Sequence, residues 1–284
     1  MTGFLAALRL ELHTGWHTLG SKLILFLPAL LAGLQLLGNS VINAGNQARD
    51  GFLGGSFEAS LSEHAYGFFV DALSTGLTFL ALLLVALGAY SFSHDRDTGA
   101  VRHLVIRVSS RPAVLLAKLI YFHLLALLAL ILLLLVSYLI SAWLWEFGPV
   151  VEDGFELIGE QEIRQEIALG LRLAIIPLPA AIAFAVLISV VASSATQAVT
   201  MAVGVTLALD LFKTVMGDYA DFLYARFQPS LVDQSYLADV SRLVRGYSDV
   251  LVDERILQLN SWTPWPALLI FLTLALLIVA RRKL

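Results

Sequence analysis

The residues best suited to chemistry are charged side chains that interrupt long apolar runs. One group lies in segment 93–116, where acidic, basic and histidine residues alternate with apolar ones. Val101 and Leu104 would share one face of a short helix, with Arg102 and Arg107 on other faces. Such an amphipathic helix suits docking into a groove of a partner protein. An ordinary basic loop between two membrane spans explains the same residues equally well.

A pair of charged residues lies inside a different apolar run. Asp210 and Lys213 are three residues apart, which places both on one face of a helix. An unpaired charge in a membrane span is costly, so the two are expected either to form a local ion pair or to line a translocation path.

Residues able to support catalysis or metal binding do not cluster. His13 and His17 could share a metal on one helical face, but no further ligand is evident, so no metal site is expected. Residues 15–22 superficially resemble a phosphate-binding loop, with Ser21 and Lys22 in the wrong order and no strand before them. The chain is therefore expected to have no catalytic residues and to bind no cofactor, and the scattered histidines argue against a membrane-embedded enzyme.

The elements that position these residues are membrane spans. Hydrophobic residues make up 58% of the 284 residues and charged residues 14%, well outside the range of soluble domains. The apolar residues fall into six runs of about the roughly 20 residues that cross a bilayer. These runs cover 23–42, 68–92, 116–145, 171–192, 198–216 and 265–280. The predicted fold is an all-α integral membrane protein with six transmembrane helices.

The basic residues predict the orientation. If the N-terminus is cytoplasmic, the inner segments hold ten of the 18 lysine and arginine residues but three of the 22 acidic ones. This asymmetry places both termini in the cytoplasm and the chain in a bacterial inner membrane. A single permease domain would then span 1–284, with an amphipathic interfacial helix in 1–22, a cytoplasmic segment in 93–116 and a structured extracytoplasmic loop in 217–262.

The segment after the second span resembles the signature of ABC-2 type permeases, the membrane subunits of ATP-binding cassette exporters. In that signature an acidic residue, a charged pair, a Gly-Thr step, an apolar helix, an arginine and a downstream lysine follow the second span. The matching residues here are Asp95, Arg96, Asp97, Gly99, Arg111 and Lys118. The lead helix, the six spans and the structured outer loop resemble the same family, so the likeness covers essentially the whole chain.

The resemblance implies a type V exporter-like bundle in which residues 95–107 form a coupling helix that docks into an ATPase. The implied coupling residues are Asp95, Arg96, Asp97, Gly99, Arg102, Arg107, Arg111 and Lys118. The ATPase, with its ATP and magnesium, would be a separate chain in two copies, and a second permease copy, as a homodimer, would complete the pathway. The substrate implied is lipid-like, amphipathic or hydrophobic.

Two other functions stay open at this point. A stand-alone secondary transporter or channel would place several ionisable groups on one pathway at the bilayer midplane, and the sequence offers few beyond Asp210 and Lys213. A membrane scaffold that transmits force to an extracytoplasmic partner would use the loop 217–262. Membrane lipids are expected as surroundings, and no nucleic acid is expected as a partner.

Overall fold

The protein is a bundle of long helices in a computed structural model, which describes residues 2–53, 65–101, 105, 110–152, 155–247 and 253–281. The first half contains α1 (Thr2–His17), α2 (Leu19–Leu53), α3 (Ala65–Asp97) and α5 (Arg111–Leu144). An antiparallel hairpin follows, made of β1 (Val150–Glu152) and β2 (Phe155–Ile158). The second half contains α6 (Glu160–Ile175), α7 (Leu178–Val191), α8 (Ala195–Phe212), the short 3-10 helices η2 (Gly217–Phe222) and η3 (Tyr224–Arg226), α9 (Tyr236–Leu243), α10 (Glu254–Trp262) and α11 (Pro264–Arg281).

Six helical stretches within the described part of the chain are long and apolar enough to cross a membrane. They are Leu19–Asn46, Ala65–Asp97, Arg111–Leu144, Glu160–Val191, Ala195–Phe212 and Glu254–Arg281. The all-α, six-span fold predicted from the apolar runs is thereby confirmed. The fourth stretch consists of α6 and α7, which are separated at Pro177, a residue that cannot donate the backbone hydrogen bond a continuous helix needs.

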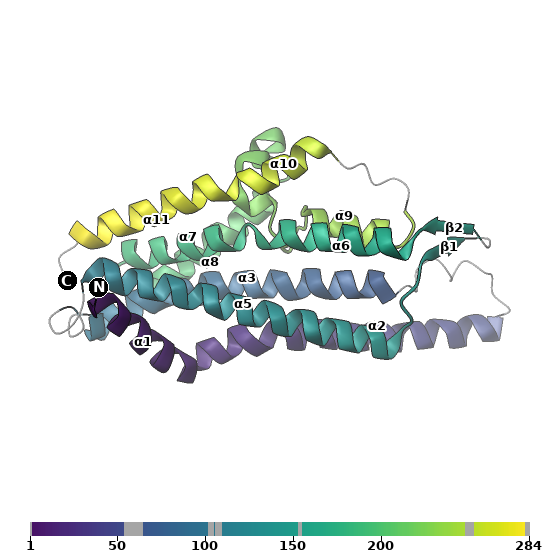
Figure 1. The fold of residues 1–284 in the computed structure, drawn as a ribbon, viewed down its shortest axis with the longest axis horizontal. Coiled ribbons are helices and arrows are strands. Elements are labelled where there is room, and N and C mark those ends of the chain that lie inside the picture. The colour runs from purple at the N-terminus through teal and green to yellow at the C-terminus, as the bar shows by residue number, and fades with distance from the viewer. Residues whose placement is uncertain are drawn as a thin grey trace.

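The helices differ in length. With 33 to 35 residues each, α2, α3 and α5 are roughly 50 Å long, about 20 Å more than a bilayer core. The 18-residue helices α8 and α11 are about as long as the core is thick. The extra length of the long helices, together with α6, α9 and the hairpin, lies away from the two chain ends (Figure 1). We call the end with Thr2 and Arg281 the termini end and the opposite end the hairpin end.

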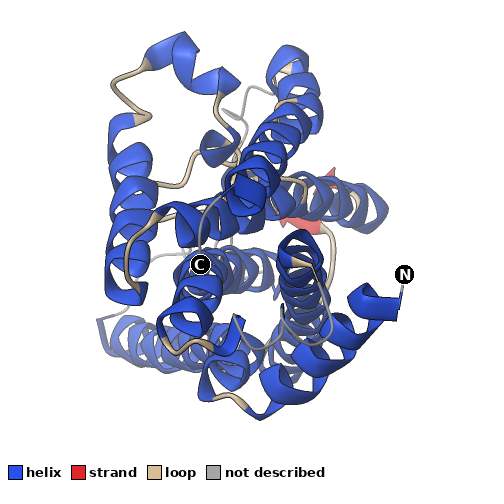
Figure 2. Ribbon diagram, turned by 90° about the vertical axis from the view of Figure 1, so that its left-hand side faces the viewer, coloured by secondary structure: helices blue, strands red, loops and turns tan. Residues whose placement is uncertain are grey.

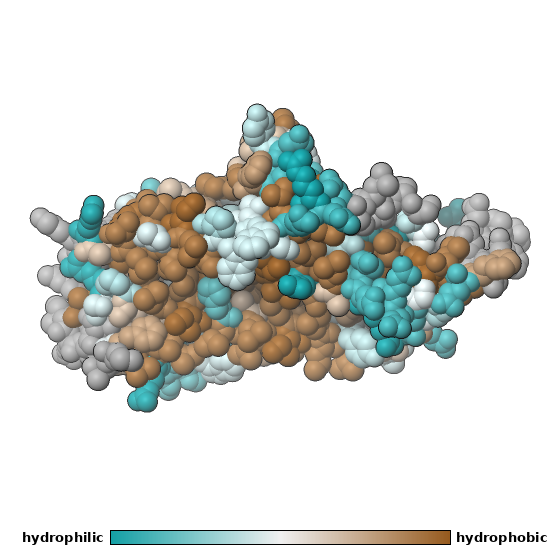
Figure 3. Space-filling view, turned by 45° about the horizontal axis from the view of Figure 1, so that its top comes forward, coloured by the Kyte–Doolittle hydropathy of each residue, from teal (hydrophilic) through white to brown (hydrophobic). Residues whose placement is uncertain are grey.

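The polarity of the surface also differs between the termini end and the hairpin end. Apolar side chains cover most of the face in Figure 3 over the half nearer the termini, and hydrophilic side chains gather toward the hairpin end. A wide apolar band of this kind is what contact with lipid requires. The sequence did not predict the length of the hairpin end, because α2, α3 and α5 extend from membrane spans into it without a break.

The core is built around α3. Leu73, Leu77, Leu80 and Leu84 recur at helical spacing along it and are fully buried. Gly76 faces Leu133 of α5 so closely that a Cβ atom would overlap the leucine side chain, and the two helices therefore approach at a small residue. An end-on view from the termini end shows the helices side by side around this centre (Figure 2).

The first helix runs obliquely to the others, along the edge of the bundle (Figures 1 and 2). Ala7 packs against Val114 and Ala117 of α5, while Leu5 and Trp16 lie exposed on the outer side. An apolar outer face is expected of a helix that rests in a membrane interface, and that location stays a prediction.

Residues 217–262 form the short helices η2, η3, α9 and α10, with 248–252 outside the described residues. Leu237 and Val240 of α9 are buried in the main core, and polar contacts of residues 233–245 join the same segment to the hairpin end. Ser74 donates to Asp233 at 2.7 Å, and the Tyr236 hydroxyl donates to Glu166 at 2.6 Å. Arg245 forms an ion pair with Asp71.

Candidate functional site

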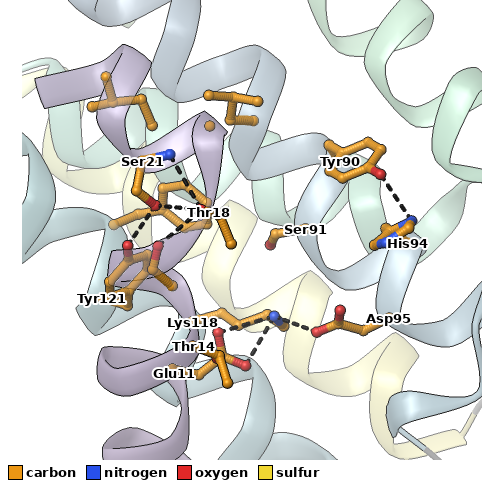
Figure 4. Close-up of a pocket in the computed structure, with 15 residues that line it drawn as sticks. Glu11, Thr14, Thr18, Ser21, Tyr90, Ser91, His94, Asp95, Lys118 and Tyr121 are labelled. Atoms are coloured by element: carbon orange, nitrogen blue, oxygen red, sulfur yellow. Dashed lines mark hydrogen bonds and ion pairs between the residues drawn. The ribbon is translucent and has the colours of Figure 1, made fainter. Parts of the chain in front are cut away.

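Lys118 lies two turns into α5, buried where α1, α3 and α5 meet. Its Nζ atom is 2.9 Å from Glu11 Oε1 and 2.5 Å from Asp95 Oδ2 (Figure 4). The whole lysine is 4% exposed and Glu11 is 8% exposed. One ammonium thus joins the first helix, the last turn of the third and the start of the fifth. We call Glu11, Asp95 and Lys118 the charge clamp.

The ions of the charge clamp stay together because separating them would leave buried charges without partners. An ion removed from water is tolerated when it is paired and hydrogen-bonded, and here each ion has a partner of opposite charge. Burial raises the pKa of Glu11, an effect that Lys118 opposes and that the neighbouring Asp95 reinforces. Loss of Lys118 would leave two carboxylates close together in this seam without a cation.

The next two residues of α3 fasten it to a different pair of helices. The Arg96 guanidinium donates to the carbonyl oxygen of Ala192 at 2.8 Å and pairs with Asp97 at 3.1 Å. The other oxygen of Asp97 accepts from the backbone N–H of Ala195 at 2.8 Å. That N–H opens α8, so Asp97 adds to the capping that Ser194 gives the same helix. The end of α3 is therefore bonded to the turn between α7 and α8.

Gly99 ends α3 in a left-handed conformation, with a φ of 79°. Its N–H donates to the carbonyl of Arg96 at 3.0 Å. A glycine takes this conformation without steric cost and is the usual residue just past a helix end. The chain turns here and returns to the core, since Val101, two residues later, is fully buried.

The other coupling residues named from the sequence are placed less fully. Arg111 is the first residue of α5, partly exposed at the termini end. Arg102 and Arg107, and most of the helix expected between them, lie outside the described residues. The structure thus brings Asp95 and Lys118 into one bonded group and bonds Arg96 and Asp97 to the α7–α8 turn. Most of the expected docking helix lies outside the described residues.

A cavity of about 360 Å³ opens beside the clamp. Its polar rim includes Ser21, Tyr90, His94 and Tyr121, and the apolar remainder includes Phe122 (Figure 4). The Tyr121 hydroxyl lies 2.6 Å from Ser21 Oγ, and the Tyr90 hydroxyl lies 2.9 Å from His94 Nδ1. The wall is close-fitting, because a Cβ atom on Gly15 would come within 2.5 Å of the Tyr121 ring.

The sequence reading missed Glu11 and the cavity residues because they come from helices far apart in the chain. Glu11 and Lys118 are 107 positions apart. A weak signal existed, since a lysine within a long apolar run requires a buried partner. Nothing in the local spacing identified that partner.

Asp210 and Lys213 form an ion pair at 2.8 Å where α8 ends. Lys213 is 1% exposed and also donates to Ser230 Oγ at 2.7 Å, while Asp210 accepts from the N–H of Val232 at 3.2 Å. The pair thus fastens residues 230–232 to the end of α8. Its possible part in a translocation path stays a prediction.

Comparison with known proteins supplies the family. No curated protein and no solved structure matches the chain. The family model described as "ABC-2 family transporter protein" matches residues 11–281, which include the charge clamp, all six apolar stretches and the folded segment after α8. The chain belongs to the ABC-2 transporter family.

Proposed function

We propose that this chain is the permease subunit of an ATP-driven exporter in a bacterial inner membrane, with both termini cytoplasmic. The observation that carries the proposal is the anchoring of the last turn of α3. Asp95 ties it to α1 and α5 through Lys118, and Arg96 and Asp97 tie it to the α7–α8 turn. An ATPase that moved the segment after this turn would act on all of these helices at once.

The proposal divides the coupling residues into two groups. Asp95, Arg96 and Asp97 make contacts within the chain, so they would transmit motion to the spans. Arg102 and Arg107 follow the turn at Gly99 and would contact the ATPase. The ATP and magnesium would reside on that separate subunit, present in two copies.

A lipid-like, amphipathic or hydrophobic substrate fits the spaces that the bundle offers. The cavity beside the clamp combines hydroxyl groups with apolar walls. A second groove of about 360 Å³ between α2 and α5 is lined by apolar residues, among them Phe26, Leu30 and Val136. An acyl chain or an extended apolar group suits such a lining.

A second copy of the chain is proposed to complete the pathway. On α8 and α11, Phe212, Leu269 and Ile270 are more than half exposed, which leaves apolar surface for lipid or for the second subunit. A homodimer would present two coupling segments to the two ATPase copies.

The test is purification of the tagged chain in mild detergent, followed by identification of co-purifying proteins and an ATP hydrolysis assay. Recovery of a roughly stoichiometric ATPase supports the proposal. The Arg96→Gln/Asp97→Asn variant should still bind that ATPase but lose coupling of hydrolysis to transport, whereas Arg9→Gln, at an exposed position of α1, should behave as wild type. Recovery of the chain alone, without hydrolysis, would favour the stand-alone transporter or channel.

One observation favours a second candidate, a scaffold that passes force to an extracytoplasmic partner. Unbroken helices run from the charge clamp to the hairpin end, well beyond a bilayer's thickness. Crosslinking at the hairpin end in intact cells would test it. Capture of a partner protein there, with ATP hydrolysis but no substrate movement in proteoliposomes, would support the scaffold over the exporter.

A further inference from the structure

A small cavity lies between α9, α10 and the chain that precedes them. Its volume is about 60 Å³, too small for an organic ligand. The polar residues that line it are Gln234, Tyr236, Asp239, Asp253 and Asn260. Every one except Tyr236 presents a carboxylate or amide oxygen, and the Tyr236 hydroxyl already donates to Glu166.

Two of the amide oxygens in this lining are buried and have no hydrogen-bond partner. They are Asn260 Oδ1 and Gln234 Oε1. Asn260 is 1% exposed, so bulk water does not reach it. A buried acceptor without a donor is unfavourable, and such a group calls for a ligand or an ordered water.

The carboxylates add negative charge to the same lining. Asp253 uses one oxygen to accept from the N–H of Arg255 at 2.9 Å, which caps α10. No lysine or arginine is among the residues that line the cavity in the described chain.

We propose that this cavity binds one hard divalent cation of the calcium type, through the carboxylates of Asp239 and Asp253 and the amide oxygens of Gln234 and Asn260. A water molecule has two hydrogens to donate, fewer than these four side chains can accept. Calcium takes six to eight oxygen ligands in flexible geometry, with water filling the remaining positions. Among the described residues no three His, Cys, Asp or Glu side chains converge as metal ligands, so this site depends on its amide oxygens.

The position of the cation gives it a structural role. Asp239 belongs to α9, whereas Asp253 and Asn260 belong to the α10 region directly before α11. A bound ion would join the folded outer segment to the last membrane helix. The inference concerns this segment alone and holds whichever transport function the chain has.

The first test is titration of the full chain in detergent with terbium, a calcium substitute whose luminescence Tyr236 would sensitise. We expect saturable luminescence that calcium displaces. The variant Asp239→Asn/Asp253→Asn should bind terbium about tenfold more weakly or worse, because ligand charge sets affinity at such sites. Asparagine at 253 keeps the α10 cap, and Asp218→Asn, at an exposed position, is the matched control.

A gain-of-binding variant keeps the test valid if the double variant folds poorly. Asn260→Asp adds a charge to the proposed ligand set and should tighten calcium binding and increase the rise in melting temperature that calcium produces. Absence of a saturable terbium signal in the wild type would overturn the proposal. So would equal affinity in the double variant, or unchanged or weaker calcium binding in Asn260→Asp.

Discussion

The two ends of the bundle use the same kind of contact under different conditions. At the termini end, the side chain of Lys118 is 5% exposed and that of its partner Glu11 is 11% exposed. At the hairpin end, Arg245 and Asp71 join the turn after α9 to α3 with side chains 16% and 33% exposed. The Arg164–Glu160 pair on α6 is more open still, at 67% and 38%. The buried clamp lies where the proposed ATPase contact begins, and the more exposed pairs lie at the hairpin end.

For the effect of breaking an ion pair on stability, access of water to the pair matters more than its position along the bundle. An exposed ion pair contributes little, because water solvates each ion once the pair is broken. A buried pair contributes little net stability when intact, yet loss of one partner is costly because the other ion stays buried.

Removal of the clamp's only cation should have the largest effect. Lys118→Met leaves Glu11 and Asp95 facing each other in the seam, and we expect it to lower the free energy of unfolding by about 3 kcal/mol. The triple variant Glu11→Gln/Asp95→Asn/Lys118→Met should recover much of that loss. Thermal unfolding in detergent measures both, with Lys22→Met at an exposed position as the control. Equal damage from the single and triple changes would mean that packing, not charge, holds this seam.

Lys213 tests burial apart from position, since it lies at the C-terminal end of α8, away from the clamp, yet is 1% exposed. We expect Lys213→Met to cost about 3 kcal/mol, as at the clamp, because Asp210 is left unpaired. The variant Asp210→Asn/Lys213→Met should be milder. If Lys213→Met lowers stability no more than a surface substitution does, burial does not determine the cost of breaking an ion pair.

A smaller effect is expected where the pair is half open to water. Asp71→Asn keeps the shape of the side chain and its contact with Ser241 but removes the charge that faces Arg245. We expect a loss of about 1 kcal/mol, measured by the same thermal unfolding assay. Arg164→Gln, in the most exposed pair, should be close to wild type. A loss at Asp71 equal to that at Lys118 would contradict the comparison.

The smallest effect is a pH dependence from Glu11. Its pKa is raised above the ordinary value of 4.5, chiefly by burial, so the folded protein binds this proton more tightly than the unfolded chain does. The stability that this proton contributes is fully present below 4.5 and is lost as the pH rises through the raised pKa. Between pH 4.5 and neutrality, the free energy of unfolding of Glu11→Gln should therefore fall less than that of the wild type. A steeper fall of stability with rising pH in Glu11→Gln would contradict the raised pKa of Glu11.

The sequence predicted the parts of this molecule that depend on local pattern. Six apolar runs predicted six membrane helices, and the spacing of Asp210 and Lys213 put them on one helical face. The resemblance to ABC-2 permeases rested on the motif that begins at Asp95, and the family is confirmed.

What the sequence could not predict depends on contacts between distant segments. Lys118 appeared as one motif residue, and its pairing with Glu11 follows from the oblique path of α1 across α5. Asp95, Arg96 and Asp97 appeared as residues for an outside partner, yet their side chains are bonded within the chain. The cation site likewise combines residues from three short segments whose packing no periodicity encodes.

The length of α3 has a mechanical consequence. Its 33 residues contain no proline, so it is a stiff rod roughly 50 Å long that is held at one end by the clamp. Pivoting such a rod by about 5° at that end swings the other by about 4 Å, close to one turn of helix. A small rotation near Asp95 would thus become a displacement of several ångströms at Ala65, at the hairpin end.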